Sequence, residues 1–134
     1  MPVAAPFADV PVNRWFGFRL VARSAERAEL ELPLRPDFLQ EAGVVQGGVL
    51  TALADSAAVY VLWPDLPPDR SMIGTGCTMA FLAAATPDRG PLRAIAVPLR
   101  RGSRMAVCES EVWQGERLVA KGTFPFLFLP RNPQ

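Results

Sequence analysis

Asp55 is the only charged residue between Val44 and Trp63, in a 20-residue run that is otherwise rich in aliphatic side chains. Its neighbours at helical spacing are the apolar residues Ala52, Val59 and Leu62. An ionised carboxylate in apolar surroundings is costly unless something compensates for its lost hydration. Charged groups in such places are candidates for function. We therefore predict that Asp55 is a catalytic carboxylate in a ligand cleft; the alternative is that it faces water on the polar edge of a helix.

Gly47 and Gly48 follow Gln46 at the expected start of that helix. Glycine weakens a helix interior by about 1 kcal/mol, so a glycine pair belongs in the first turn, where a ligand can approach the backbone closely. The first N–H groups of a helix are unpaired and carry partial positive charge. The Gly47 amide is therefore suited to bind a carbonyl oxygen as it becomes an oxyanion. The alternative is that the two glycines serve close packing of the helix on a sheet.

The spacing of these two groups adds a constraint. Asp55 lies eight residues beyond Gly47, so their Cα atoms are about 12 Å apart along a helix axis. One helix cannot easily bring both groups to the same carbonyl. Two antiparallel helices related by a two-fold axis could, with Gly47 of one subunit facing Asp55 of the other. A dimer of this kind would have two equivalent sites.

The composition excludes several other chemistries. The chain has no histidine, which excludes Ser-His and Cys-His hydrolases, histidine zinc sites and His-dependent dehydratases. Cys77 and Cys108 are 31 residues apart and lack metal-ligand spacing, so we predict small structural residues and no metal site. The net charge of +1 gives no sign of a nucleic-acid partner.

Apolar periodicity indicates one long helix among strands. A helix is predicted over residues 44–63, because core-type residues recur at helical spacing and Pro64 follows. Its expected core stripe is Leu50, Leu53, Ala54, Ala57, Ala58 and Val61. Strand-like runs occupy residues 16–22, 28–32, 71–83, 92–99, 105–113 and 118–129. Pro125 suggests an edge or a bulge in the last run. Two strands, one helix and four strands make an α+β layout.

The chain length of 134 residues suits a single domain. We expect one domain over residues 1–134, in which residues 1–14 form an irregular, Pro-rich lead-in. This lead-in lacks the basic and apolar regions of a signal peptide, so a cytoplasmic location is expected. Asp55 at the centre of the apolar run disfavours a membrane span. A lone helix covers a sheet face only in part, which is a reason to expect self-association.

The stretch from Gln40 to Asp55 resembles the hotdog-fold acyl-CoA thioesterases of the PaaI and 4-hydroxybenzoyl-CoA type. In that family a loop Asn or Gln is followed six residues later by His-Gly-Gly, and an Asp or Glu comes nine residues after the His. Gln40, Gln46-Gly47-Gly48 and Asp55 match this spacing. The sequence departs from the family at Gln46, which can hydrogen-bond but cannot carry a proton as the usual His does.

The resemblance implies a hotdog fold, in which an antiparallel sheet of about five to six strands wraps the long helix. It also implies a homodimer that often pairs into a homotetramer, a dimer of dimers, with the site at a subunit interface. By this likeness Gly47 supplies the oxyanion amide and Asp55 of the partner subunit is the nucleophile or the general base. Gln40 orients the water or the thioester carbonyl. Coenzyme A enters only as part of the substrate, and no cofactor is expected.

Substrate contacts are predicted in three places. Arg100, Arg101 and Arg104 cluster at one expected turn and suit the phosphates of coenzyme A; the alternative is a solvated turn. Gly48 lets the substrate approach the helix start. By the family likeness, Thr75 or Gly74 contributes near the thioester. Phe81 and Tyr60 are candidates for the acyl pocket, although core packing would also explain both residues.

Three functions remain open at this point. The first is hydrolysis of an acyl-CoA thioester by Asp55 and the Gly47 amide. The second is a hotdog domain that binds an acyl-CoA or another acyl ligand without turning it over, which Gln46 favours. The third is a purely structural oligomerisation module, which the lone charge of Asp55 makes less attractive.

Overall fold

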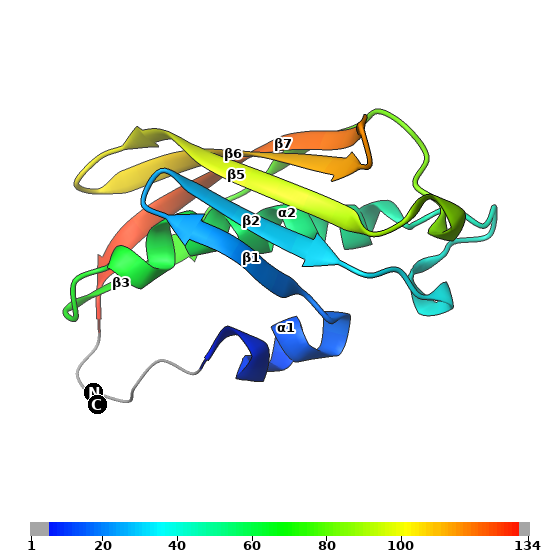
Figure 1. Cartoon of the computed structure of the whole chain (residues 1–134). Coiled ribbons are helices and arrows are strands. Elements are labelled where there is room, and N and C mark those ends of the chain that lie inside the picture. The colour runs from blue at the N-terminus through cyan, green and yellow to red at the C-terminus, as the bar shows by residue number, and fades with distance from the viewer. Residues whose placement is uncertain (1–5, 132–134) are drawn as a thin grey trace.

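The structure, a computed structural model of the chain, describes residues 6–131 (Figure 1). Its main elements are a long helix and a twisted antiparallel sheet. The helices are α1 (Pro11–Phe16) and α2 (Gly47–Leu62). The strands are β1 (Arg19–Ser24), β2 (Arg27–Leu32), β3 (Arg70–Gly74), β4 (Thr78–Phe81), β5 (Leu92–Arg101), β6 (Met105–Gln114) and β7 (Arg117–Pro130). Short 3-10 helices occupy Phe7–Asp9, Pro36–Phe38, Trp63–Asp65 and Pro87–Arg89.

The seven strands form one antiparallel sheet in the order β1-β2-β5-β6-β7-β3, and β4 also pairs with β7. β3 and β4 are two pieces of one edge, because both pair with β7 at successive positions. They replace the single strand predicted over residues 71–83, which is interrupted at residues 75–77. The predicted hotdog arrangement is confirmed. The sheet has seven strands rather than the expected five to six, because the edge strand is split into β3 and β4.

α2 lies across one face of the sheet (Figure 1) and supplies the centre of the core. All six residues of the predicted core stripe are buried, and Leu62 joins them. On the sheet side, the Ser110 hydroxyl of β6 donates to the Ala54 carbonyl oxygen at 2.8 Å. By length and composition alone, Gly47–Asp65 could cross a membrane. Its packing against the sheet is that of a core helix.

Two arginines satisfy the carbonyl groups at the C-terminal end of α2. Arg23 of β1 donates to the carbonyl oxygens of Tyr60 and Val61, both at 2.8 Å, and pairs with Asp65 at 2.6 Å. Arg101, at the end of β5, donates to the Val61 carbonyl oxygen at 3.5 Å. Cations are favourable at this end of a helix. β1 and β5 are therefore both fastened to the end of α2.

The prediction of an irregular lead-in over residues 1–14 is wrong for the residues that the structure describes; residues 1–5 lie outside them. Phe7–Asp9 and α1 are helical, and the strand predicted from residue 16 begins only at Arg19. Pro11 is the first residue of α1, and Gly17 ends it with a φ of 85°. Both are preferred positions for these residue types. α1 forms because these two residues mark its ends.

Pro125 does not mark an edge strand, since β7 lies between β6 on one side and β3 and β4 on the other. Its carbonyl oxygen accepts from the Thr75 N–H at 3.0 Å. Thr75 belongs to the interruption between β3 and β4. The N–H that proline lacks would face this same interruption. Proline is tolerated in a central strand here because the neighbouring strand is broken opposite it.

The buried stripe of α2 yields a test of the fold. Leu53 is fully buried, whereas Leu99 on β5 is 55% exposed. Leu53→Ala should lower the free energy of unfolding by about 2–5 kcal/mol, because it leaves a cavity in the core. Leu99→Ala, the matched control, should change it by less than about 0.5 kcal/mol. Urea denaturation followed by circular dichroism measures both, and equal losses would contradict this packing.

Candidate functional site

The N-terminal end of α2 is held in place by backbone hydrogen bonds from two loops. The Gln46 N–H donates to the Phe38 carbonyl oxygen, and the Val45 N–H donates to the Ala85 carbonyl oxygen, both at 2.9 Å. Gln40 begins a tight loop in which its N–H donates to the Val44 carbonyl oxygen at 2.8 Å. The side-chain oxygen of Gln40 accepts from the Ala42 N–H within the same loop. Its NH2 group has no partner among residues 6–131.

Gln46 is the N-cap of α2. Its side-chain Oε1 accepts from the Gly48 N–H at 2.8 Å, which satisfies one of the unpaired donors at the helix start. A Cβ added at Gly48 would lie 2.6 Å from this oxygen. A larger residue at position 48 would therefore displace the Gln46 side chain from its present position. The Gly48 amide is already occupied by the cap. Sequence reasoning assigned both residues to the helix start but did not identify this bond.

The Gly47 N–H is the donor that the cap leaves free. No atom of residues 6–131 accepts a hydrogen bond from it. It lies at the end of α2 where the aligned peptide dipoles place partial positive charge. These two properties are those of the predicted oxyanion donor.

Phe81 of β4 packs directly on Gly47. A Cβ added at Gly47 would lie 3.0 Å from Cζ of the Phe81 ring. This contact supports the close-packing explanation for the glycine, and the ligand-binding role of its amide stays a prediction. The Phe81 side chain is 55% exposed, so the ring lies beside the free amide while part of it remains open to solvent. Of the two candidate pocket residues, Phe81 is the one that adjoins the helix start.

Asp55 lies on the side of α2 that faces away from the core stripe, and in the single chain it is exposed. Its carboxylate makes no hydrogen bond or ion pair with any residue in the range 6–131. Desolvation by the surrounding residues nevertheless raises the pKa of Asp55 above its usual value. An unpaired carboxylate with a raised pKa fits a general base or nucleophile awaiting a partner group. In one protomer it also matches the solvent-facing alternative.

Within one protomer Gly47 and Asp55 do not meet, as their spacing along α2 requires. Thr75 lies at the β3–β4 interruption, where its hydroxyl donates to the Pro125 carbonyl oxygen at 3.4 Å. Gly74 ends β3 and is exposed. Both residues therefore belong to the open sheet edge that also carries Phe81.

The predicted arginine turn lies elsewhere in the protomer. Arg100, Arg101 and Arg104 belong to the β5–β6 hairpin, at the opposite end of α2 from Gly47 (Figure 1). Arg101 is engaged with the carbonyl oxygens of Ala25 and Val61. Within one protomer this turn therefore lies away from Gly47, and its contact with coenzyme A across a subunit interface stays a prediction.

Three further residues differ from or refine the predictions. Tyr60 packs against the N-terminal segment, where its hydroxyl accepts from Asn13 Nδ2 at 3.2 Å and its ring lies 4.6 Å from the Phe7 ring. Cys108 is buried, and desolvation raises its pKa to about 11, as suits a structural thiol. Cys77 lies exposed between β3 and β4 rather than within a strand.

The family model of the Thioesterase superfamily matches residues 42–121. AziG from S. sahachiroi is 29% identical, with 90% of this chain and 98% of that chain covered and a TM-score of 0.85. A conserved protein from Pseudomonas aeruginosa is 30% identical, with coverages of 88% and 93% and a TM-score of 0.80.

A phenylacetic acid degradation-related protein from Ralstonia eutropha JMP134 is 28% identical, with 92% of each chain covered and a TM-score of 0.84. No relative was found among curated proteins. The similar structures span nearly the whole described chain, so the match is not confined to the motif around α2.

The Gln46 cap yields a test of the site's local structure. Gln46→Ala removes the acceptor for the Gly48 N–H and should lower the free energy of unfolding by about 0.5–2 kcal/mol. Gln46→Asp keeps an acceptor at the N-cap and should restore most of this loss. Thermal or urea denaturation of the three proteins measures the effect. An unchanged stability of the alanine variant would show that the cap does not support α2.

Proposed function

Because this chain belongs to the thioesterase superfamily, we propose that it is an acyl-CoA thioesterase whose site is shared between two subunits. The Gly47 amide of one subunit receives the thioester carbonyl oxygen, and Asp55 of the other drives the attack. The observation that carries this proposal is the free Gly47 N–H at the positive end of α2. It leaves one strong donor pointing out of a capped helix beside an exposed sheet edge.

The open edge of the sheet supports a two-fold dimer. Among residues 6–131, β3 and β4 each pair only with β7, so their outer backbone groups are available to another strand. The same edge exposes Ile73 and Phe81, and Leu82 follows directly after β4. Because Phe81 touches Gly47, a second copy on this edge would approach the free amide. An antiparallel arrangement of the two helices would bring Asp55 of each toward Gly47 of the other.

The proposed reaction needs only water as its co-reactant. In the general-base route, Asp55 takes a proton from water, and the oxygen attacks the carbonyl carbon. The negative charge that develops on the carbonyl oxygen is stabilised by the Gly47 N–H. Collapse of the intermediate breaks the carbon–sulfur bond, and the proton held by Asp55 passes to the departing thiolate, which releases the carboxylic acid and coenzyme A. In the nucleophilic route, Asp55 attacks the carbonyl carbon first and expels the coenzyme A thiolate, and water then hydrolyses the resulting anhydride to the acid and free Asp55.

Gln40 and Gln46 would act as neutral hydrogen-bonding groups. Gln46 Oε1 is engaged in the helix cap, while its NH2 group has no partner within residues 6–131 and can donate to the substrate. Gln40 likewise keeps a free NH2 group for the water or the carbonyl. Because a glutamine amide neither accepts nor releases a proton in this pH range, Asp55 would be the only general base or acid among these residues.

Gln46 favours a second function, which is the binding of an acyl-CoA without its hydrolysis. The residue serves the helix cap, and a domain with an intact cap and no proton carrier at this position could bind an acyl-CoA without hydrolysing it. The two functions differ in whether thiol is released, which the next experiment decides.

Asp55→Asn should abolish thiol release from a panel of short, medium and aromatic acyl-CoAs. In the wild type, kcat/KM should fall as the pH drops through the pKa of Asp55, which lies above the usual value of 3.8.

A raised carboxyl pKa means that folding favours the protonated form, so ionised Asp55 destabilises the fold at neutral pH. The asparagine variant should therefore unfold at the same temperature as the wild type or higher. Unchanged turnover by a folded variant would remove Asp55 from the mechanism, and a wild type that binds acyl-CoA without thiol release would favour the binding function.

The role of the Gly47 amide is testable with two matched substitutions. Gly47→Pro removes the N–H, and proline suits the first helical position; Gln46 already has an extended conformation, with φ −66° and ψ 139°, as the residue before proline prefers. Gly47→Ala adds the same Cβ toward Phe81 but keeps the N–H. We expect kcat of the proline variant to lie about 10²–10³-fold below that of the alanine variant. Equal rates for the two would eliminate the amide as the oxyanion donor.

Mixing the two inactive chains tests whether the site is shared. A dimer of one Gly47→Pro chain and one Asp55→Asn chain has one intact site and one doubly impaired site. Random co-assembly should therefore recover about a quarter of the wild-type activity per dimer, since half of the dimers are mixed. Sedimentation confirms the assembly. Absence of recovery in verified mixed dimers would place both groups in one chain's site.

A further inference from the structure

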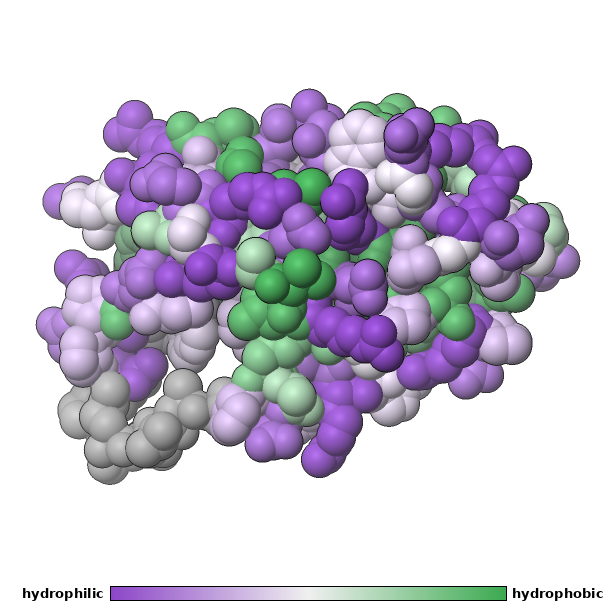
Figure 2. Space-filling view, in the orientation of Figure 1, coloured by the Kyte–Doolittle hydropathy of each residue, from purple (hydrophilic) through white to green (hydrophobic). Residues whose placement is uncertain are grey.

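A basic hollow of about 440 Å3 lies beside α1, outside the site described above. It is formed by the end of α1, the start of β1 and the chain after β2. Its charged lining residues are Arg14, Arg19 and Arg35, and its apolar lining includes Phe16, Phe18 and Leu34. No acidic residue lines it. Figure 2 shows this face, where hydrophilic side chains flank an apolar strip that crosses β1 and α1.

None of the three arginines makes a short ion pair within residues 6–131, and Arg35 also donates to the Phe16 carbonyl oxygen at 3.4 Å. Arg14 has no ion pair among residues 6–131. Arg19 pairs with Glu31, and Arg35 pairs with Asp37, each at a long distance of 3.4 Å. Long, exposed pairs of this kind contribute about 0–1 kcal/mol. A phosphate oxygen binds a guanidinium more strongly, through charge-assisted and often bidentate hydrogen bonds. The charge and the hydrogen-bond donors of the hollow therefore suit a phosphorylated anion.

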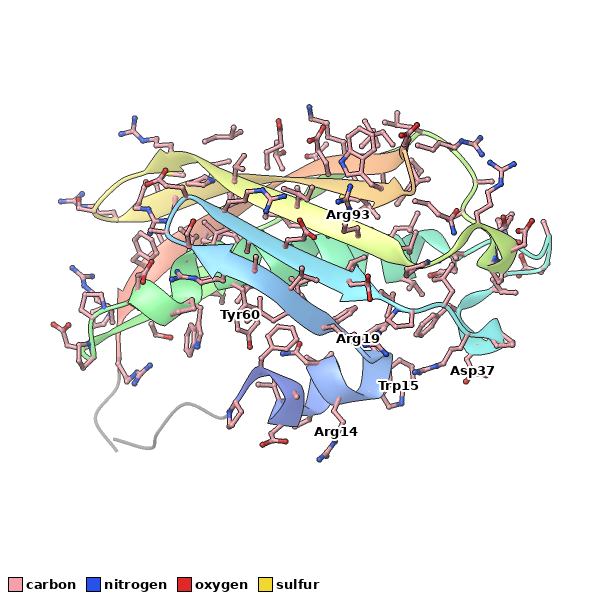
Figure 3. All side chains as sticks on the ribbon, viewed as in Figure 1. Arg14, Trp15, Arg19, Asp37, Tyr60 and Arg93 are labelled. Atoms are coloured by element: carbon pink, nitrogen blue, oxygen red, sulfur yellow. The ribbon has the colours of Figure 1, made fainter. Side chains whose placement is uncertain are left out.

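An aromatic surface adjoins these charges. Trp15 is 64% exposed, and its ring lies edge-on to Phe16 with centroids 4.9 Å apart. The Arg35 guanidinium lies 5.2 Å from the Trp15 ring centroid. Figure 3 shows Arg14, Trp15, Arg19 and Asp37 together at the α1 end of the molecule. Exposed aromatic rings beside arginines provide stacking surfaces for nucleic-acid bases, so a ligand with both a base and phosphates fits this surface.

The hollow also connects to the helix start. The Arg35 guanidinium lies 4.3 Å from the Phe38 ring centroid. The carbonyl oxygen of the same Phe38 accepts from the N–H of Gln46, the N-cap of α2. Arg35 of the basic hollow is thus linked to Gly47 through Phe38 and Gln46, whereas the β5–β6 arginine turn lies at the other end of α2.

From this arrangement we propose that the basic hollow binds the phosphorylated adenine nucleotide end of coenzyme A. Arg14 and Arg19 contact the phosphates, Trp15 stacks on the adenine, and Arg35 is held between Trp15 and Phe38 as a third cation. This assignment deepens the proposed function, on which it rests, by replacing the β5–β6 turn as the phosphate-binding element.

The test is a set of binding measurements on the full chain, which do not depend on turnover. Isothermal titration calorimetry compares coenzyme A, 3′-dephospho-coenzyme A, 3′,5′-ADP and pantetheine. Arg14→Gln combined with Arg19→Gln should weaken coenzyme A and 3′,5′-ADP binding at least about tenfold, since each lost charged hydrogen bond accounts for roughly that factor. Pantetheine binding should not change. Trp15→Ala should weaken 3′,5′-ADP binding while leaving pyrophosphate binding unchanged.

The control removes two positive charges from β7, as Arg117→Gln with Lys121→Gln; three strands separate β7 from β1 in the sheet. Thermal unfolding of all variants verifies that they fold. Wild-type affinity for coenzyme A in the Arg14 and Arg19 variant, or an equal loss in the control, would overturn the assignment. Wild type that binds 3′,5′-ADP in the hollow but releases no thiol would instead refute the proposed hydrolysis and leave the nucleotide site standing. An unchanged KM for acyl-CoA in the active double variant would refute the nucleotide site and leave the hydrolysis standing.

Discussion

The rigid spacing along α2 is the constraint on which the proposed site depends. A helix cannot bend its eighth residue back to its first, so the free Gly47 amide and the unpaired Asp55 carboxylate remain apart in one chain. The rest of the architecture is consistent with completion by a second copy. The sheet ends in a broken, partly apolar strand edge, and Phe81 of that edge touches the helix start. An exposed acid with a raised pKa is what an unassembled half-site would contain.

Much of this arrangement could be predicted from the sequence, because strong local patterns encode it. The helical spacing of Leu50 to Val61 identified both the long helix and its buried side. The glycines after Gln46 identified the helix start. The short helix α1 was missed because its proline suggested irregular chain, although Pro11 and Gly17 are ordinary helix-boundary residues. The contact between Phe81 and Gly47 joins segments 34 residues apart, and no local pattern reports such a distance.

The position of the arginines illustrates the same limit. Three arginines adjacent in sequence drew attention to the β5–β6 turn, yet Arg101 is engaged in binding carbonyl oxygens at the end of α2. Arg14, Arg19 and Arg35 are dispersed in the sequence and gather only when α1, β1 and the chain after β2 fold together. Composition counts charges, but the fold decides which of them remain available to a ligand.

The two ends of α2 differ in how their free backbone groups are hydrogen-bonded by the rest of the chain. At the carbonyl end, two guanidinium groups bind the Tyr60 and Val61 oxygens, which fastens this end to strands far apart in the sequence. At the amide end, the Gln46 side chain caps the Gly48 N–H, and the Gly47 N–H keeps no acceptor among residues 6–131. Both ends of α2 are nevertheless held by residues outside β3 and β4, because the Phe38 and Ala85 carbonyl oxygens bind the chain at the amide end. Side-chain changes in β3 and β4 would therefore reshape the surface beside the Gly47 amide without removing the contacts that fix the helix start.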